Sequence, residues 1–296
     1  MQKIAVIDLG SLKLKTTVFD KTKHEKVGSI SILTLLGKEL DNNHRILSSS
    51  LEMLAGALVE TKQYLQENTV DEIKIIGTEA LRKAKNKSAA QKAIDKHFPR
   101  HEIEIIDQNQ EAVLFFTAVS HDFPNETITA MDIGGGSVQI INGKFNTATD
   151  KVNIENSNHY KTGTYRLQQQ YSPSNEVISD RLDEAAAFIK KEYSNIAHKS
   201  SVLVFGSTCM LDFIMASGIT VLSDANNKKF VTRKSLENLL GVLVKLPPNK
   251  RNCYYPENEY FMYGADFLLM NIIAASKKIG ASRIYPTNIN SAYAYA

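Results

Sequence analysis

Two short stretches of the sequence combine an acid with glycine in a pattern suited to holding phosphate. Residues 8–11 (Asp-Leu-Gly-Ser) and 132–135 (Asp-Ile-Gly-Gly) align without gaps, and each follows an apolar run. A tight glycine turn exposes successive backbone N–H groups, and such nests bind phosphate oxygens. Residues 134–136 are three glycines in a row in a chain with only 15. The acid at the end of each run is a suitable ligand for Mg²⁺ opposite those phosphates.

The elements that must position these turns are strands. Residues 4–8 and 128–132 are apolar runs that end in the acid, as buried strands entering a turn do. Each turn is followed by a β-branched or apolar run, at 16–19 and 138–141, which predicts the returning strand of a hairpin. The unit of strand, turn and strand therefore occurs once in each half, as an internal repeat. Two similar domains facing one another would bring both turns to a shared cleft.

Strands and helices alternate along the rest of the chain, which predicts the α/β class. Spacing and composition predict helices at residues 47–65, 89–97, 110–119, 182–193, 234–243 and 258–278. Further strands are predicted at residues 73–76, 103–106 and 202–205. A turn cluster at 121–125 marks the expected domain boundary. We expect an N-terminal domain over residues 1–122, with residues 283–296 as candidates to rejoin it, and a second domain over 123–282.

Composition excludes several function classes. The 296 residues are 43% hydrophobic and 23% charged, as in a globular protein with substantial cores. A net charge of +3 is too small to indicate a nucleic-acid binder, and two cysteines form neither a disulfide framework nor a metal-ligand pattern. The N-terminus lacks a signal peptide's apolar core, and the apolar stretch 267–276 is too short to span a bilayer. We expect a soluble, cytoplasmic protein that binds neither nucleic acid nor membrane.

Further short motifs accompany the two turns. Thr-x-Ala-x-Arg followed by Ala-x-Asn occupies residues 78–86, and a Glu-Ala pair at 111–112 opens a predicted helix. Later motifs are Gly-x-x-Arg-Leu, Gly-Ser and Ala-Asp, at residues 163–167, 206–207 and 265–266. Together with Asp-Ile-Gly-Gly-Gly-Ser at 132–137, this series resembles the exopolyphosphatase and guanosine pentaphosphate phosphohydrolase family of the actin-like ATPase superfamily. The matches follow the family's order across nearly the whole chain.

The resemblance implies a fold and a reaction. The fold would be two similar actin-like (ribonuclease H-like) α/β domains with an interdomain cleft, and the reaction would be Mg²⁺-dependent hydrolysis of a phosphoanhydride. Asp8 and Asp132 would hold the metal and organise water. Arg82 would neutralise charge on the transferred phosphoryl group, and Glu111 would activate the attacking water. The implied phosphate contacts are Gly10, Ser11, Lys15, Gly134, Gly135, Gly136 and Ser137.

The implied substrate is inorganic polyphosphate or a guanosine pentaphosphate-type nucleotide. Many members of the family are dimers, so the resemblance also implies that this chain could form a homodimer. Three charged residues also have simpler interpretations. Glu111 near a helix start is favourable through the helix dipole alone, while Arg82 and Lys15 have the alternative of being ordinary surface cations.

Departures from the family pattern support a second hypothesis. Gln110 stands where the family has the first acid of a pair, and Gln139 replaces a glutamate after the triple glycine. The family's C-terminal Gly-Leu-Arg-Glu-Gly element is unrecognisable at residues 288–293. These changes favour a catalytically weakened member that binds or senses a phosphorylated ligand. A third hypothesis, an actin-like kinase or ATPase with another substrate, fits the motifs at 78–86 and 111–112 less well. The phosphohydrolase is the function we expect.

Overall fold

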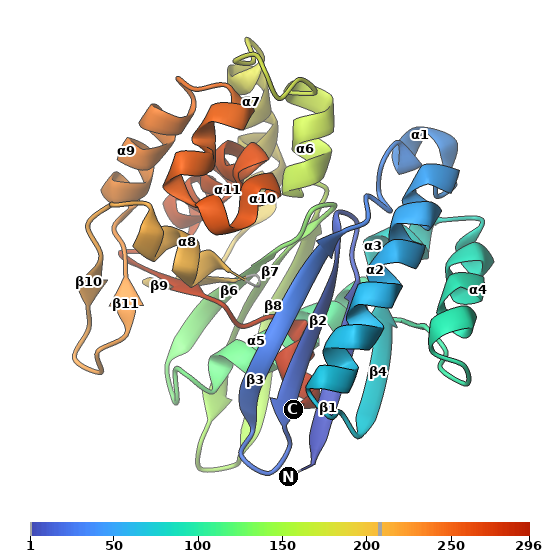
Figure 1. Ribbon diagram of the computed structural model, residues 1–296. Coiled ribbons are helices and arrows are strands. Elements are labelled where there is room, and N and C mark those ends of the chain that lie inside the picture. The colour runs from blue at the N-terminus through green and yellow to red at the C-terminus, as the bar shows by residue number, and fades with distance from the viewer. Residues whose placement is uncertain (1, 207–208) are drawn as a thin grey trace. The chain divides into compact units, whose positions relative to one another are not determined.

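The computed structural model describes residues 2–206 and 209–296, and the chain divides into two compact units (Figure 1). Unit 1 comprises the residues up to Leu114 together with Ser291–Ala296, and unit 2 comprises Phe115–Asn290. The sequence placed the boundary at 122/123, whereas the contacts divide the chain within helix α5 (Gln108–Ser120). The physical reason is aromatic packing, because the Phe115 ring lies against Gly206 and the Phe116 ring against Gly143 of unit 2.

Unit 1 is built on a five-stranded sheet in the order β3-β2-β1-β4-β5. Its strands are β1 (Lys3–Leu9), β2 (Lys13–Asp20), β3 (Glu25–Leu33), β4 (Glu72–Gly77) and β5 (Glu104–Ile105). β1 is antiparallel to β2 and parallel to β4. Alternate side chains of a strand point to opposite faces of its sheet, so Asp8 shares a face with Val6 and opposes the face of Ile7.

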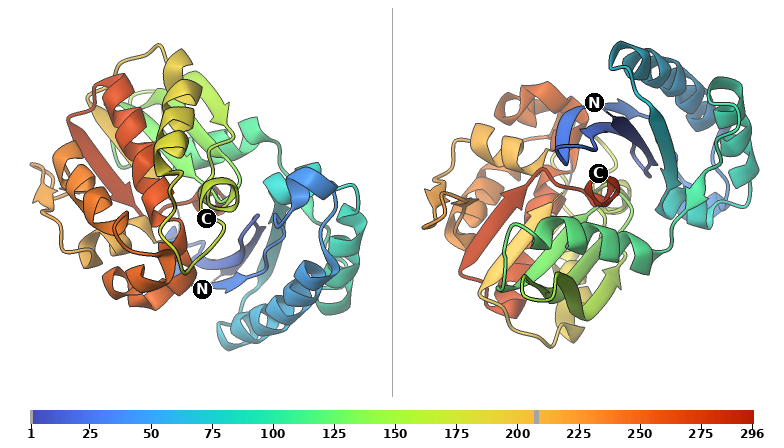
Figure 2. Two further views of the ribbon diagram at one scale, coloured as in Figure 1. Left: turned by 90° about the horizontal axis from the view of Figure 1, so that it is seen from above. Right: turned by 90° about the horizontal axis from the view of Figure 1, so that it is seen from below.

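Helices cover one face of the unit 1 sheet, and the end of the chain covers the other. The helices are α1 (Leu40–Asn43), α2 (Ser48–Glu67), α3 (Glu79–Lys83) and α4 (Lys87–His97). Leu54 and Leu58 of α2 and Ile94 of α4 join the apolar core that contains Ile7. Figure 2 shows α2 and α4 on the same side of the sheet of unit 1. On the Val6 side, Ala292 of the short 3-10 helix η4 (Ser291–Tyr295) completes a second, smaller core.

Unit 2 repeats the sheet of unit 1. Its strands are β6 (Thr127–Ile133), β7 (Val138–Asn146), β8 (Lys151–Tyr160), β9 (Val202–Gly206) and β12 (Arg283–Thr287), in the order β12-β9-β6-β7-β8. β6 takes the central place of β1, since it is antiparallel to β7 and parallel to β9. The predicted α/β class with two similar domains is therefore confirmed. Residues 283–290, which the sequence offered to the N-terminal domain, belong to unit 2 because β12 pairs with β9.

Unit 2 carries most of the helices. They are α6 (Thr164–Tyr171), α7 (Leu182–Glu192), α8 (Met210–Ala216), α9 (Arg233–Leu243), α10 (Glu259–Tyr263) and α11 (Ala265–Ile279). Shorter elements are the hairpin β10 (Leu222–Ser223) and β11 (Lys229–Phe230) and the 3-10 helices η1 (Tyr193–Asn195), η2 (Pro248–Tyr254) and η3 (Pro256–Asn258). α11 is buried along almost its whole length, with Phe267, Leu269 and Ile272 fully inside the core. In the described ranges, no helix is long and apolar enough to cross a membrane.

A buried ion pair anchors α11. Nη1 of Arg251, in η2, lies 2.9 Å from Oδ2 of Asp266, and neither side chain is more than 1% exposed. The Arg251 Nε also donates to the carbonyls of Leu243 and Leu246, each at 3.1 Å. Burial raises the pKa of Asp266, and the Arg251 charge opposes that rise. The Ala-Asp motif at 265–266 therefore contributes an internal support of unit 2.

Candidate active site

The first turn joins β1 to β2 in unit 1. The Gly10 N–H donates to the Lys13 carbonyl at 3.1 Å, which closes the turn, and Asp8 stands opposite Lys15 across the hairpin. Asp8 is partly exposed as a residue, but its Oδ1 is inaccessible to solvent and has no hydrogen-bond partner among residues 2–206 and 209–296. Burial raises the pKa of Asp8, and the charges of Lys15 and Arg82 offset part of the rise. Asp8 is thus an acid that lacks a neutralising contact on one oxygen.

Arg82 and Glu111 form an ion pair in the same unit. Arg82 lies on α3, directly after β4, and Glu111 lies in the first turn of α5. Arg82 Nη1 is 2.9 Å from Glu111 Oε2 and donates to the Ile106 carbonyl at 2.8 Å. The two side chains are only 16% and 13% exposed, so the pair is largely desolvated. The Arg82 Nη2 is buried and has no hydrogen-bond partner in the described part of the chain, which leaves a donor for a ligand.

A reciprocal cap orients the start of α5. The Gln110 N–H donates to Asp107 Oδ1, and the Asp107 N–H donates to Gln110 Oε1, both at 2.8 Å. This is a capping box, in which a glutamate or a glutamine serves equally well as the acceptor. Gln110 therefore works in the helix cap that places Glu111. The sequence alone indicates a lost acid at Gln110, whereas the structure gives this residue a role that needs no charge.

The second turn joins β6 to β7 in unit 2 and has the same closure as the first. The Gly134 N–H donates to the Ser137 carbonyl at 3.0 Å. Asp132, at the end of β6, is in register with Gln139 on β7. Gln139 is buried, and its Nε2 donates to Ser137 Oγ at 3.1 Å. The internal repeat found in the sequence therefore extends to individual hydrogen bonds.

The predicted site residues fall into two sets, one in each unit. Unit 1 brings Asp8, Lys15, Arg82 and Glu111 into one electrostatic group beside the turn that contains Gly10 and Ser11. Unit 2 assembles Asp132, Gly134, Gly135, Gly136 and Ser137 on a single turn. That the two turns share a cleft stays a prediction. Ser207 of the Gly-Ser motif lies outside the described residues.

Sequence reasoning missed two glycines that pack against the turns, Gly37 and Gly163. Their shared place in the repeat is the signal that could have found them, because each follows the strand that is third along the chain in its unit, β3 or β8. In the sequence, Gly163 stands out only as the first residue of the motif at 163–167, and Gly37 belongs to no motif.

The residues of the first turn fit a metal that needs few protein ligands. In the described ranges, no group of three or more His, Cys, Asp or Glu residues gathers. Mg²⁺ is commonly held by one or two carboxylates together with waters and substrate phosphates. The buried Oδ1 of Asp8, without a hydrogen-bond partner, is a carboxylate oxygen of the kind such an ion uses.

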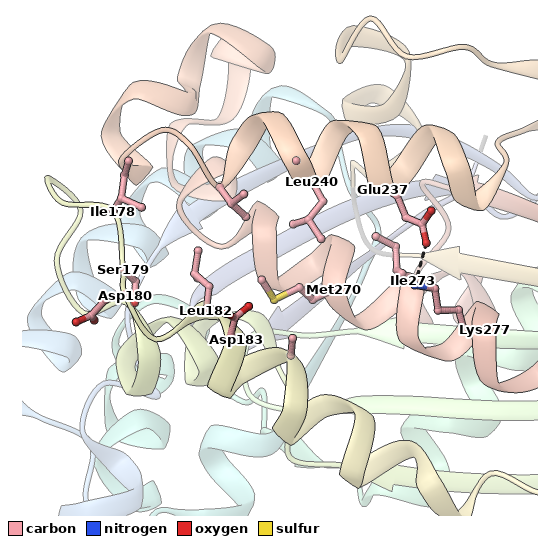
Figure 3. A pocket seen from close by; sticks show the side chains of 13 residues that line it. Ile178, Ser179, Asp180, Leu182, Asp183, Glu237, Leu240, Met270, Ile273 and Lys277 are labelled. Carbon is pink, nitrogen blue, oxygen red and sulfur yellow. Dashed lines mark ion pairs between the residues drawn. The ribbon is translucent and has the colours of Figure 1, made fainter.

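A pocket of about 570 Å³ lies elsewhere in unit 2, between α7, α9 and α11 (Figure 3). Leu182, Leu240 and Met270 line it, and an ion pair between Glu237 and Lys277, 2.9 Å apart, lies at one end. None of its lining residues belongs to either glycine turn. This pocket is therefore not part of the candidate site.

Comparison with known proteins gives matches to one family of phosphatases. Residues 18–253 match the model of the Ppx/GppA phosphatase family. A guanosine-5'-triphosphate,3'-diphosphate pyrophosphatase from Aeromonas salmonicida is 26% identical over 250 residues, which cover 80% of this chain and 47% of that protein. The chain spans about half the length of the curated relatives it matches.

Solved structures show the same fold. An exopolyphosphatase from Cytophaga hutchinsonii has a TM-score of 0.82 at 20% identity, covering 99% of this chain and 96% of that one. The Ppx/GppA family member from Aquifex aeolicus has a TM-score of 0.76 at 18% identity, with the same coverages. Identities this low establish the two-domain actin-like fold alone, whereas the family model covers most of the sequence. The chain therefore belongs to the Ppx/GppA phosphatase family.

Proposed function

We propose that the chain is a Mg²⁺-dependent phosphohydrolase that releases the terminal phosphate of inorganic polyphosphate or of a guanosine pentaphosphate-type nucleotide. The observation that carries this proposal is the desolvated Arg82–Glu111 pair beside Asp8, in a member of a phosphatase family. The names of its relatives support the substrate classes, since they include an exopolyphosphatase and a guanosine-5'-triphosphate,3'-diphosphate pyrophosphatase.

Arg82 can bind a phosphoryl group and Glu111 at the same time. Its Nη1 is used by the Glu111 carboxylate and the Ile106 carbonyl, while its Nη2 has no partner among the described residues. A phosphate oxygen received by Nη2 would place negative charge against a guanidinium that is already fixed in position. Fixed donors of this kind stabilise charge that develops in a transition state. The same contact holds Glu111 close to the phosphoryl group, where it would accept the proton of the attacking water.

The glycine turns and the strand-end acids complete the proposed site. Backbone N–H groups of the two turns would cradle the phosphate oxygens, with Lys15 adding a cation on the returning strand. Asp8 and Asp132 would hold the Mg²⁺, which supplies positive charge to the phosphate oxygens. We propose further that the protein is a cytoplasmic homodimer and binds neither nucleic acid nor membrane.

One observation favours a second candidate, a member that binds a phosphorylated ligand without turnover. Gln139 stands where the family has a glutamate; it is buried, and its amide donates to Ser137 Oγ. An amide at this position cannot supply the negative charge of a carboxylate to metal or water. Binding through the turn would persist under this alternative, while hydrolysis would not.

The proposal is tested by phosphate release from polyphosphate and from guanosine pentaphosphate in the presence of Mg²⁺. Loss of a general base typically costs about 10²–10⁴-fold in rate, so Glu111→Gln should reduce release to that extent. Glu52→Gln, an exposed change on α2, is the matched control and should leave the rate unaltered. Folded wild-type protein that releases no phosphate with Mg²⁺, Mn²⁺ or Co²⁺ would overturn the hydrolase. Tight binding of polyphosphate without turnover would then favour the second candidate.

A further inference from the structure

The carbonyl groups of the triple glycine all face one segment of unit 2. The Thr164 N–H donates to the Gly134 carbonyl at 3.0 Å, and the Arg166 N–H donates to the Gly135 carbonyl at 2.9 Å. The Arg166 side chain completes the series, because its Nε donates to the Gly136 carbonyl at 2.9 Å. Three successive carbonyls are thus held by the segment that begins α6.

This arrangement decides where the N–H groups of the turn point. In a planar trans peptide, the carbonyl of one residue and the N–H of the next point in opposite directions. Carbonyls 134, 135 and 136 point toward α6, so the N–H groups of Gly135, Gly136 and Ser137 point away from it. In the described part of the chain, none of these three N–H groups donates to a backbone carbonyl. The turn therefore presents three consecutive donors on the side opposite α6.

Gly163 allows the segment to approach this closely. A Cβ at Gly163 would lie 2.3 Å from Gly136 C, 2.4 Å from Ser137 N and 2.6 Å from Gly135 C. Real Cβ atoms essentially never come this near, and all three atoms belong to the backbone, which cannot rotate aside. Any side chain at position 163 must therefore shift either the turn or the segment that supports it.

The turn of unit 1 has an equivalent support. The Gly37 N–H donates to the Ser11 carbonyl at 2.7 Å, and the N–H groups of Thr34 and Leu35 donate to the Leu12 carbonyl at 3.0 and 2.9 Å. A Cβ at Gly37 would lie 2.8 Å from the Ser11 Cβ. The supporting segment follows β3 in unit 1 and β8 in unit 2, which is the same place in the repeat.

We propose that Gly163 and Arg166 are positioning residues that set the N–H groups of residues 135–137 for phosphate binding, and that Gly37 does the same for the turn of unit 1. Arg166 acts through the Gly136 carbonyl, which it holds in place, and its charge is not required for this role. The proposal rests on the proposed function of the turns as phosphate sites. It adds three residues outside the turns on which that function depends.

Gly163→Ala tests the close approach. Tripolyphosphate with Mg²⁺ is the probe, and its Kd is measured by calorimetry alongside KM and kcat for hydrolysis. We expect Kd and KM to rise about tenfold or more, as for the loss of a hydrogen bond to a charged group. Gly241→Ala on α9, where a Cβ meets nothing within 4 Å, should leave both constants unchanged. Partial unfolding would lower kcat and the binding stoichiometry at constant Kd, and that result would overturn the proposal.

Two substitutions of similar length, glutamine and methionine, distinguish the positioning role of Arg166 from a role of its charge. Arg166→Gln keeps an N–H donor at the same distance along the side chain as Nε but removes the charge. Arg166→Met keeps the length and has no donor. A positioning role predicts that Gln retains tripolyphosphate affinity within about threefold of the wild type, while Met loses about tenfold. Equal losses in both variants would indicate a direct charge contact and would overturn the role proposed for Arg166.

Amide hydrogen exchange separates this proposal from the proposed function. The Gly134 N–H is protected by its bond to Ser137, so displacement of the turn should speed exchange in the peptide covering residues 132–139. We expect faster exchange in Gly163→Ala than in Gly241→Ala, whether or not the protein binds phosphate. If the wild type neither binds nor hydrolyses tripolyphosphate, the proposed function fails. The exchange rates still test whether Gly163 holds the turn in place. Identical exchange rates in the two variants would overturn the positioning role of Gly163.

Discussion

The Arg82 guanidinium contacts two groups and acts electrostatically on a third. It bonds the Ile106 carbonyl and the Glu111 carboxylate, acts on Asp8 through space, and keeps Nη2 for a ligand. The planar fork of arginine makes such shared contacts, whereas the point charge of lysine does not. The identity of this residue therefore matters as much as its charge.

We predict that Arg82→Lys lowers kcat for phosphate release by about 10²-fold, close to the effect of Arg82→Met, because both lose fixed donors to the phosphoryl group. Steady-state kinetics with polyphosphate measures this. Arg100→Lys is the control, since Arg100 is exposed and lies beyond α4, outside the elements that carry the site residues. An Arg82→Lys variant with wild-type kcat would show that charge alone is needed at this position.

His198 gives the stability of unit 2 a pH dependence. Its Nε2 lies 3.1 Å from Thr129 Oγ1. The same hydroxyl oxygen accepts a hydrogen bond from Asn142 Nδ2 at 3.4 Å. Burial lowers the pKa of His198; Lys199 lowers it further, while Glu155 opposes this. Protonation removes the lone pair of His198 Nε2, so a protonated His198 could no longer accept a hydrogen bond from the Thr129 hydroxyl.

The sign of the effect follows from the lowered pKa. Between the folded pKa and the ordinary value of 6.5, the unfolded chain binds more protons than the folded chain. We therefore predict that the free energy of unfolding decreases as pH falls below about 6.5, until the folded pKa is passed. Urea unfolding at several pH values measures this slope. His198→Gln, which does not titrate, should reduce the slope between pH 7 and pH 5, and an unchanged slope would contradict the assignment.

At the scale of elements, the capping box of α5 connects stability to the placement of Glu111. Asp107 accepts from the Gln110 N–H and closes the box. We predict that Asp107→Ala destabilises the protein by about 1 kcal/mol, as the loss of an N-cap side chain does. Thermal unfolding measures the loss.

Gln110→Glu is the companion variant. It restores the acid found in the family and retains the acceptor of the box, so we predict unchanged stability and unchanged kcat. A large rise in kcat would show that the missing acid had been limiting catalysis, contrary to the structural role of Gln110.

Most of the strands that the sequence predicts are buried, whereas β3 and β8, which it misses, are partly exposed; β12 is missed although it is buried. β1, β6 and β9 are buried runs between other strands, and every predicted helix occurs, although the one at 258–278 is interrupted at Gly264. β3 and β8 were missed because they are edge strands with largely exposed side chains. An edge strand is held by backbone pairing with one neighbour, so its side chains carry little periodic signal.

At the scale of the whole molecule, a segment distant in the sequence closes the face of the unit 1 sheet that carries Asp8. In unit 1 this closure comes from the last six residues of the chain. Ala292 packs with Ile4 and Val6, and the Tyr293 ring meets Phe19 edge-on at 4.9 Å between centroids. The C-terminal segment is thus part of the core beneath Asp8, although it is distant from Asp8 in the sequence.

We predict that deletion of residues 291–296 destabilises unit 1 by about 2 kcal/mol or more, because it exposes apolar side chains of β1. Thermal unfolding and binding of a hydrophobic dye measure the loss. Glu52→Gln, an exposed change on α2 outside this core, is the control and should unfold close to the wild type. A truncated chain as stable as the full chain would show that the segment is not part of this core.

Local features of the sequence determined the α/β class, the repeated turns and the family, because strand periodicity and glycine turns are encoded by neighbouring residues. The same local signals identified Asp8 and Asp132 as candidates, and the resemblance to the family implied Arg82 and Glu111. Tertiary structure decided which of them meet. The Arg82–Glu111 pair and the support of Gly136 by Arg166 each join residues about 30 positions apart, and the division of the chain inside α5 depends on where two aromatic rings pack. Such contacts form only when separate elements fold together. Their free energy comes from packing and desolvation between distant segments, and no local pattern in either segment indicates the other.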